Sequence, residues 1–553
     1  MEMNAEKEKL HCETNPDESD RISNLPDSIR QHILSFVDTR EAVRTCILSS
    51  SWRALPESLP TLDLGQASLY TSAMNECLPA CDDKDAARIA NREKILRVRT
   101  SFYAFLDRAL GSYMEMEKLN IYFQGLDLEL KSRLDGWVAG AVRRRVKELG
   151  LRFNPWKGLR YTFPSSVIVP KLIKKLELVS CELSSSCLVD DQLPCLREIC
   201  FEYVNADDAF IANLLASCLN LEKLTLKSCY GLTRLEIFCH SKLEKVVFEH
   251  CEKEVEVIKI EAPNLYEFSY ASDGYIESDI DFGACKKLKV LELDGCELND
   301  YDLADILNNH PMLERLSLEK CHNLYHAEVS NQNLVDLIFV DCRDLEKVII
   351  DTPYLRFFFY EGEYPITFVC NGPTLQLEEA SISLKHDYRK KVWFNGLLKF
   401  LSQLCWTESL SLDVAYEKDL IIPETVRTKC RPPLYAVKHL DVEFRLSRLK
   451  RPVKVIQSLL WLAPHPETIS ISCGELLACK TLKFTYEKPS TDKQNCSCCE
   501  SLPVSCWRHS LVKVCIENDR GADDDNDTEL AHFFGKARIG AKIECFSKNR
   551  SRF

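Results

Sequence analysis

The stretch Leu313–Cys321, LERLSLEKC, decides the fold of this chain. Leu316 and Leu318 alternate with polar residues, as in a short β-strand with one buried face. Six cysteines close the same six-residue phrase: LELVSC at Cys181, LTLKSC at Cys229, VVFEHC at Cys251, LELDGC at Cys296, LSLEKC at Cys321 and LIFVDC at Cys342. The intervals between them are 48, 22, 45, 25 and 21 residues. The two long intervals are each about twice the short ones, so the phrase follows one period of 21 to 25 residues.

The two long intervals each contain a further copy that has lost its cysteine. These copies are LREICFEYV from Leu196 and LYEFSYASD from Leu265, and others begin at Val146, Leu355 and Leu377. A period of 21 to 25 residues with the pattern L-x-x-L-x-L-x-x-C/N is the signature of a leucine-rich repeat. Stacked copies form a parallel sheet along one wall, and the Cys or Asn bonds to backbone where the chain turns away. We therefore expect Cys229, Cys296 and Cys321 to be buried, reduced structural thiols.

Several segments between the strand phrases carry helical periodicity. Residues 205–224 have Asp residues as candidate caps, followed by apolar residues with helical spacing at Phe210, Ile211, Leu214, Leu215 and Cys218. Residues 298–316 repeat this arrangement, with Asn299 or Asp300 as the cap and Pro311 beyond the end. The expected class is α/β: a horseshoe-shaped solenoid with a parallel sheet on the concave side and helices or irregular returns on the convex side.

Composition limits the classes of function. The net charge of −13 disfavours binding to nucleic acid or to anionic membranes. The N-terminus lacks a signal-peptide pattern, and no apolar stretch approaches the roughly 20 residues that span a bilayer. The 27 cysteines are odd in number and spread along the chain, which indicates reduced thiols. We expect an intracellular protein of the nucleus, the cytoplasm or both.

Residues 20–52, DRISNLPDSIRQHILSFVDTREAVRTCILSSSW, stand apart from the repeats. Leu25, Ile29 and Ile33 are spaced four residues apart, as on one face of a helix, and a second amphipathic helix leads to Trp52. This apolar face could be buried against the first repeat as a solenoid cap, because solenoid ends need capping. Alternatively, it could be covered by another protein.

The same stretch closely resembles the plant F-box, through its L-P-x-x-I, I-L-S-F and V-R-T-x-x-L-S-x-x-W elements. Near the C-terminus, Cys506–Asn518 and Thr528–Ala537 resemble the last strand and helix of the FBD segment found in plant F-box/leucine-rich-repeat proteins. The chain departs from the usual F-box at Ser50 and Ser51, where a basic pair is common. The resemblance implies domains at 20–64 (F-box), 65–400 (repeats) and 401–540 (further repeats with the FBD-like segment), between an acidic tail at 1–19 and a basic tail at 541–553.

The resemblance also implies a function. Such proteins are non-catalytic substrate receptors of SCF-type ubiquitin ligases: the F-box docks on a Skp-type adaptor, which connects to a cullin and a RING protein, and the repeats capture a protein target. The residues that match the motif and would contact the adaptor are Leu25, Pro26, Ile29, Ile33, Leu48 and Trp52. The alternative is a repeat scaffold that binds partners without assembling a ligase.

Neither an enzyme nor a metalloprotein is indicated. The chain contains no G-x-S-x-G, H-E-x-x-H, Walker-A or G-x-G-x-x-G motif. The group Cys496, Cys498, Cys499, Cys506 and His509 has zinc-ligand residue types without a regular finger spacing. We predict no cofactor and no metal.

The target-binding surface is predicted on the outward strand positions of the repeats. In the earlier repeats these positions are polar, whereas those of the repeats at Leu334 and Leu355 are Ile338, Val340, Phe357 and Phe359. Exposed apolar groups of this kind mark interaction sites, and aromatic anchors dominate binding energy. The alternative is that the C-terminal segment folds over these residues and buries them. The identity of the target is not encoded in a recognisable motif.

Overall fold

The computed structural model describes residues 25–37, 39, 42, 61–65, 84–111, 115–123, 128–154, 160–163, 172–183, 193–251, 255–272, 279–370, 377–385, 393–446, 449–474, 480–487, 507–518, 524–537 and 540–547. The chain divides into two compact units, Met1–Thr233 (unit 1) and Arg234–Phe553 (unit 2). Of the predicted sites, Leu48, Trp52 and the cysteines Cys496, Cys498, Cys499 and Cys506 lie outside the described residues.

Unit 1 contains a parallel sheet in the order β1 (Thr61–Gly65), β2 (Lys118–Phe123), β3 (Glu148–Phe153), β5 (Lys175–Val179), β7 (Glu198–Glu202) and β8 (Lys223–Lys227). In the described part of unit 1, the strands are connected by the helices α4 (Lys84–Gly111), α5 (Leu128–Arg143) and α7 (Asp208–Ser217). The short strands β4 (Tyr161–Thr162) and β6 (Cys181–Glu182) pair with each other. Because β1 starts at Thr61 and pairs with β2, the sheet begins inside the segment that we had assigned to the F-box.

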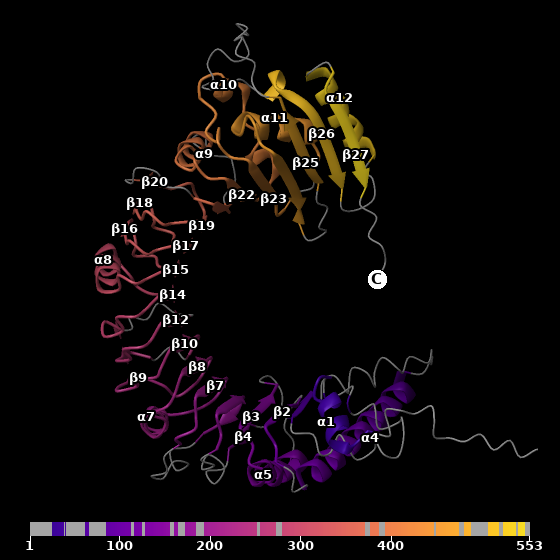
Figure 1. The fold of residues 1–553 in the computed structure, drawn as a ribbon, viewed down its shortest axis with the longest axis vertical. Coiled ribbons are helices and arrows are strands. Elements are labelled where there is room, and N and C mark those ends of the chain that lie inside the picture. The colour runs from indigo at the N-terminus through magenta and orange to yellow at the C-terminus, as the bar shows by residue number, and fades with distance from the viewer. Residues whose placement is uncertain are drawn as a thin grey trace, which may run out of the picture. The chain divides into compact units, whose positions relative to one another are not determined.

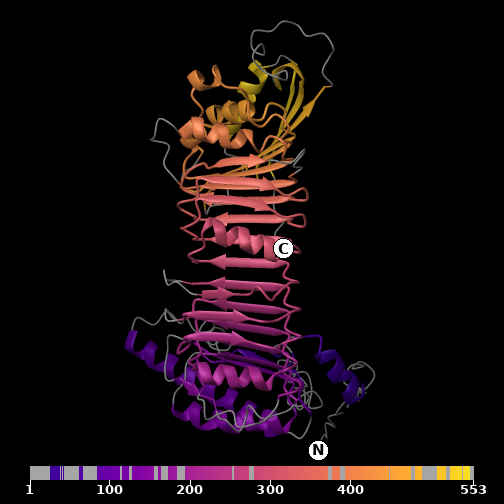
Figure 2. The ribbon, with the colours of Figure 1, turned by 90° about the vertical axis from the view of Figure 1, so that its left-hand side faces the viewer.

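Unit 2 contains a longer main sheet. Its parallel part runs through β10 (Lys245–Glu249), β12 (Glu267–Ala271), β14 (Val290–Asp294), β15 (Arg315–Glu319), β17 (Asp336–Val340), β19 (Phe357–Gly362), β21 (Glu379–Leu384), β22 (Ser409–Val414), β23 (His439–Phe444) and β24 (Thr468–Cys473). The strands stack like rungs (Figure 2). The repeat and the α/β class are therefore confirmed.

The return segments of unit 2 lie opposite its main sheet (Figure 1). They are β9 (Arg234–Ile237), β11 (Val257–Ile260) and β13 (Asp279–Asp281), β16 (His326–Ser330), β18 (Lys347–Asp351) and β20 (Thr367–Cys370), and the helices α8 (Asp300–Asn309), α9 (Trp393–Ser402), α10 (Glu424–Arg427) and α11 (Pro452–Leu462). We call the other face of each main sheet, which carries the outward strand positions, the open face of that unit.

Repeat length decides whether a return is a strand or a helix. Registered positions such as Arg315 and Asp336 are 21 residues apart, and β16 returns between them. Val290 and Arg315 are 25 residues apart, and this return contains α8. A ten-residue helix rises about 15 Å, as does a five-residue strand at about 3.3 Å per residue. Both therefore span the same height, but the helix consumes more chain.

The predicted helix caps are confirmed. Asp207 is the N-cap of α7, and its side chain accepts a hydrogen bond from the backbone N–H of Phe210 at 2.6 Å. Asn299 is the N-cap of α8 and forms a capping box with Asp302. The apolar residues that we expected to face inward from α7 are buried. Cys218, the last residue of that apolar pattern, is the C-cap of α7 and is buried as well.

The C-terminal part of unit 2 departs from the repeat. Strand β25 (Lys480–Tyr486) is antiparallel to β24, and β26 (Leu511–Asn518) is antiparallel to β25. Helix α12 (Asp524–Ala537) packs on α11, and β26 and α12 occupy the positions where a strand and a helix were expected. The prediction of a basic tail from residue 541 is wrong for Lys542–Ser547, which form β27 parallel to β26. This segment is held by backbone pairing and by the ion pair between Lys513 and Glu544.

Each repeat cysteine follows a backbone turn of one kind. All six cysteines come directly after a residue with φ between 49° and 70°: Ser180, Ser228, His250, Gly295, Lys320 and Asp341. The left-handed region costs a non-glycine residue roughly 1–2 kcal/mol. Hydrogen bonds offset this cost, since the N–H of Lys320 donates to the carbonyl of Val340 at 2.8 Å and that of Ser180 donates to Glu202 at 2.9 Å. The turn is thus stabilised by the neighbouring repeat.

Gly295 occupies the most restricted of these turns. Its φ is +70°, and a Cβ atom added there would lie 2.4 Å from the backbone oxygen of Ser272. Gly295→Ala is therefore expected to cost about 1–3 kcal/mol and to lower the thermal unfolding midpoint. Ser228→Gly, at the equivalent turn of another repeat, should change stability by less than about 1 kcal/mol. Equal midpoints for Gly295→Ala and the unmodified protein would contradict this explanation of the turn.

Candidate protein-docking surfaces

The first described helix is α1 (Asp27–Leu34), which lies within the F-box-like stretch. The carbonyl oxygen of Pro26 accepts hydrogen bonds from the N–H groups of Ile29 and Arg30 at 2.9 and 3.1 Å, so the chain turns into the helix at this proline. Arg30 and Leu34 are buried, and the Arg30 guanidinium pairs with Asp27 one turn earlier. One face of α1 is therefore packed within the protein.

A neighbouring face of α1, about a quarter turn around the helix from Arg30 and Leu34, is apolar and exposed. Ile29 is 46% exposed and Ile33 is 40% exposed, and Phe36 and Val37 continue the exposed stripe just beyond the helix. Residues spaced three, four or seven apart lie on one side of a helix, so these side chains form one surface. An exposed apolar stripe on a folded unit is typical of a helix that docks into a groove of another protein.

The structure places four of the six predicted adaptor contacts. Pro26, Ile29 and Ile33 are exposed and Leu25 is half-buried, whereas Leu48 and Trp52 are outside the described residues. The cap interpretation holds for other residues of this region. Ala42 is buried, and the Thr39 hydroxyl accepts a hydrogen bond from the Asp63 N–H on β1 at 2.9 Å. Phe36 and Val37 were not among the predicted contacts, although both are exposed and continue the apolar spacing of the helix.

The predicted target-binding residues lie on the open face of unit 2, on β17 and β19. Ile338 is opposite Phe359 in the strand register, and Val340 is opposite Glu361. Ile338 is buried, while Val340, Phe357 and Phe359 are half-buried. The expectation of an exposed apolar patch is thus wrong for Ile338. Its neighbours Ser317 and Phe359 on the adjoining strands flank it closely, because paired strands lie only about 4.8 Å apart.

The C-terminal strands continue the sheet instead of covering the patch. Strand β25 pairs with the edge of β24, and β26 and β27 follow it in order. Within the described parts of the chain, therefore, the C-terminal strands do not bury Phe357 and Phe359 as our alternative interpretation supposed.

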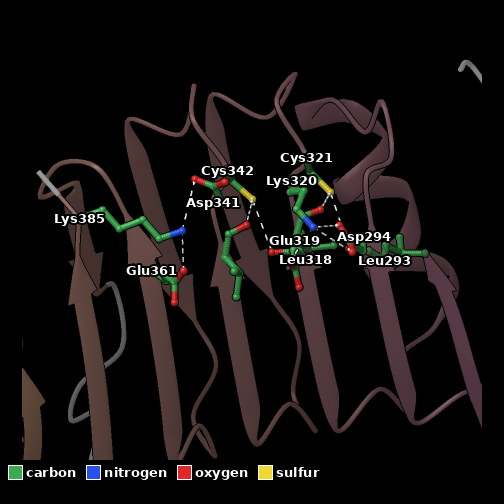
Figure 3. Close-up of polar contacts among 11 residues, drawn as sticks. Leu293, Asp294, Leu318, Glu319, Lys320, Cys321, Asp341, Cys342, Glu361 and Lys385 are labelled. Atoms are coloured by element: carbon green, nitrogen blue, oxygen red, sulfur yellow. Dashed lines mark hydrogen bonds and ion pairs between the residues drawn. The ribbon is translucent and has the colours of Figure 1, made fainter. Parts of the chain in front are cut away.

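Ion pairs cross the carboxyl-terminal edge of the strands in unit 2 (Figure 3). Lys320 pairs with Asp294 at 3.1 Å and Glu319 at 2.8 Å, and Lys385 pairs with Glu361 at 2.6 Å. Burial disfavours the Lys320 ammonium, but its hydrogen bonds to both carboxylates keep its pKa above the ordinary value. Burial raises the pKa of the Asp294 carboxyl despite its bond to Lys320. The carboxylates make this edge negatively charged, and the Lys320 and Lys385 ammonium groups neutralise part of that charge.

The repeat thiols come directly after the turns at this edge, and they bond to backbone carbonyl groups. Cys342 donates to the carbonyl oxygens of Leu318 and Val340 at 3.5 and 3.6 Å, and Cys321 donates to that of Glu319 at 3.5 Å (Figure 3). Contact with the Cys342 thiol and burial both raise the pKa of Cys321. The prediction of free, buried thiols is confirmed for Cys229 and Cys321. These groups join neighbouring repeats and are poor nucleophiles.

The prediction for Cys296 is only partly confirmed. Its thiol is free, but the residue is half-buried and not buried. It borders a cavity of about 590 Å³ between β13 and α8, which opens one side of the residue. Burial still raises the pKa of its thiol to about 12.

Thiol labelling tests this arrangement. Native protein treated with iodoacetamide near neutral pH should modify Cys229 and Cys321 at least about tenfold more slowly than Cys239, which is exposed in unit 2. The reason is that alkylation requires an accessible thiolate. Mass spectrometry of proteolytic fragments gives the rate at each site, and labelling in urea should make the rates converge. Equal rates in native protein would show that the repeat register is wrong.

Two further findings concern the chain as far as it is described. None of the described helices is both long and apolar enough to cross a membrane. Three or more His, Cys, Asp or Glu side chains arranged to hold a metal ion do not occur among the described residues. The candidate zinc ligands cannot be placed, since only His509 of that group is described.

Comparison with known families supports the two-part organisation. Residues 22–64 match the F-box domain. Residues 109–277 and 272–444 match the family described as At1g61320/AtMIF1, LRR domain, which together is more than half of the chain.

Similar proteins are found in Arabidopsis thaliana. A putative F-box/LRR-repeat protein is 26% identical over 46% of this chain and 52% of its own length. A putative F-box/FBD/LRR-repeat protein is 25% identical over 60% of this chain and 79% of its own length, and another F-box/FBD/LRR-repeat protein is 32% identical over 37% and 40%. The chain spans about half the length of this first relative and of two other F-box/LRR-repeat proteins of the same plant. The FBD segment is supported only by the names of such relatives.

Proposed function

Since the chain belongs to the leucine-rich-repeat family described as At1g61320/AtMIF1, LRR domain, and carries an F-box domain ahead of the repeats, we propose that it is the substrate-recognition subunit of an SCF-type ubiquitin ligase. The observation that carries this proposal is the exposed apolar face of α1, which lies inside the F-box match and presents Ile29 and Ile33 to solvent. F-box domains in general bind Skp-type adaptors.

In this proposal the two parts of the chain have separate tasks. The F-box docks its apolar stripe on the adaptor, which connects to the cullin and the RING protein. The repeats hold a protein target on an open face. The chain itself performs no chemistry, because its contribution is to raise the concentration of target lysines near the charged conjugating enzyme. The proposal implies a site of action in the nucleus, the cytoplasm or both.

Co-purification tests the proposal against a scaffold that assembles no ligase. The full chain, expressed with a plant Skp-type adaptor and cullin, should elute with both in one complex. A chain that remains alone while a known F-box protein assembles under the same conditions would favour the scaffold.

Target capture is predicted to depend on Phe357 and Phe359. Changing both to Ser removes two half-buried aromatic side chains from the open face. Such anchors typically contribute 2 kcal/mol or more, so capture of cellular targets should fall at least about 30-fold while the adaptor still co-purifies. The measurement is a quantitative pull-down after proteasome inhibition. If the variant unfolds instead, the two aromatics belong to the core and the target site lies elsewhere.

A further inference from the structure

The open faces of the two units differ in charge. The described outward strand positions of unit 1 carry five acidic and five basic residues, and several of them pair across neighbouring strands. Lys118 pairs with Asp63, Arg152 with Glu177, and both Lys175 and Lys223 with Glu198. This face is electrically balanced by its own side chains.

The open face of unit 2 is not balanced in this way. From β14 to β24, the outward strand positions carry nine carboxylates and a single Lys or Arg, namely Arg315. Three cations from the turns, Lys320, Lys385 and Arg445, pair along one edge. The carboxylates remain in clear excess over the cations.

Three of these carboxylates are available to a partner. Glu379, Asp441 and Glu443 are exposed, and in the described part of the chain no Lys, Arg or His lies within ion-pair distance of them. They lie on the strands that follow the aromatic residues across the sheet, Glu379 on β21 and the other two on β23. Glu379 is directly opposite Phe357 in the register.

The register also sets the spacing between the aromatic and the acidic groups. Phe359 is followed across the sheet by Ser381, Ser411 and then Asp441. Neighbouring strands are about 4.8 Å apart, so three steps cover about 14 Å, which is the length of roughly four residues of extended chain. The two serines between them are small and leave this path unobstructed.

We propose that the open face of unit 2, from β17 to β24, binds a cationic protein segment in an extended conformation. Its apolar side chain lies against Phe357 and Phe359, and its Lys or Arg side chains, about four residues along, face Asp441 and Glu443. This inference rests on the proposed function, because it names the class of target segment that the receptor holds. The aromatic contact supplies most of the affinity, and the carboxylates select against acidic segments.

The test uses the full chain in complex with its adaptor and short fluorescein-labelled peptides. The probe peptide has a tryptophan followed four residues later by two lysines, in a Gly/Ser background. Two matched peptides carry glutamates instead of the lysines, or serine instead of the tryptophan. Fluorescence anisotropy should show at least tenfold tighter binding of the probe than of either matched peptide. Its affinity should fall as salt rises, because charge pairs at a surface are screened.

Variants locate the site. Asp441→Lys with Glu443→Lys should weaken the probe at least tenfold and favour the glutamate peptide. The control Glu328→Lys makes the same change on β16, on the return side of unit 2, and should leave binding unchanged. If the double lysine variant does not fold, Asp441→Asn with Glu443→Gln removes the charges with less disturbance, and should again weaken the probe.

The outcomes separate this inference from the ligase proposal. Absence of probe binding, equal binding of the lysine and glutamate peptides, or indifference to the Asp441 and Glu443 variants overturns the inference, even if the adaptor stays bound. Loss of adaptor association from the unmodified chain overturns the ligase proposal. In that case probe binding by the chain alone would still support the cationic-segment site.

Discussion

Replacing Ile29 and Ile33 together with Ala is expected to abolish co-purification of a Skp-type adaptor. The two side chains lie on one side of α1 and are 46% and 40% exposed in the free chain, so truncating them removes the apolar surface that is open to the partner. Truncating a central anchor costs about 2 kcal/mol or more, and two such losses lower affinity by roughly 10³-fold if they add. Titration of adaptor by calorimetry, or pull-down at defined concentrations, measures the change.

A matched control separates this effect from a general loss of exposed apolar surface. Leu128 and Leu446 are more exposed than Ile29 and Ile33, and changing both to Ala should leave adaptor binding intact. Leu25→Ala with Pro26→Ala should also abolish binding, partly because Pro26 sits at the start of α1. Full adaptor affinity in the Ile29/Ile33 variant would show that another surface makes the contact.

The second large effect is expected at a buried charge cluster in the C-terminal part of unit 2. Lys480 on β25 pairs with Asp527 on α12, and Asn518 on β26 donates to the same carboxylate at 2.5 Å. All three side chains are buried. Asp527→Ala leaves the Lys480 ammonium buried without its carboxylate, which typically costs 3–5 kcal/mol. Hydrogen exchange of the β26 amides should accelerate at least about 100-fold, provided that exchange there occurs through local opening.

The control lies on the same two strands. Lys483 pairs with Glu517 at 2.7 Å, but Lys483 is half exposed to solvent. Glu517→Ala should therefore cost less than about 1 kcal/mol. Replacing Lys480 with Met in the Asp527→Ala background should recover much of the loss, because no unpaired charge remains buried. If both single variants exchange at the same rate, the buried cluster is not what holds β25, β26 and α12 together.

The repeat architecture could be predicted from the sequence because each copy of the repeat carries the same spacing of apolar residues. Strand phrases such as Leu316–Cys321 recur often enough to define the period without knowledge of any contact. The caps of α7 and α8 could be predicted for a related reason. Asp207 and Asn299 act on backbone groups within three residues of themselves, so local sequence contains the whole interaction.

Exposure within a repeat was less predictable. Ile338 and Phe359 occupy outward positions of the same pattern, yet Ile338 is buried and Phe359 is half-buried. The difference arises from the residues that the register places beside them, which are distant in sequence. Cys296 likewise has the phrase of Cys321, but it borders the cavity beside α8 and is less buried.

By itself, the sequence of this protein determined the parallel repeat, the turns before the cysteines and the apolar stripe of α1, since each depends on spacing along one short segment. Only the tertiary structure decided which carboxylates form an ion pair with a Lys or Arg side chain. Asp294 is paired by Lys320, whereas Glu379, Asp441 and Glu443 face none within the described chain. The physical reason is that an ion pair depends on distances of a few ångströms across strands 21 to 30 residues apart, and only the register brings those side chains together.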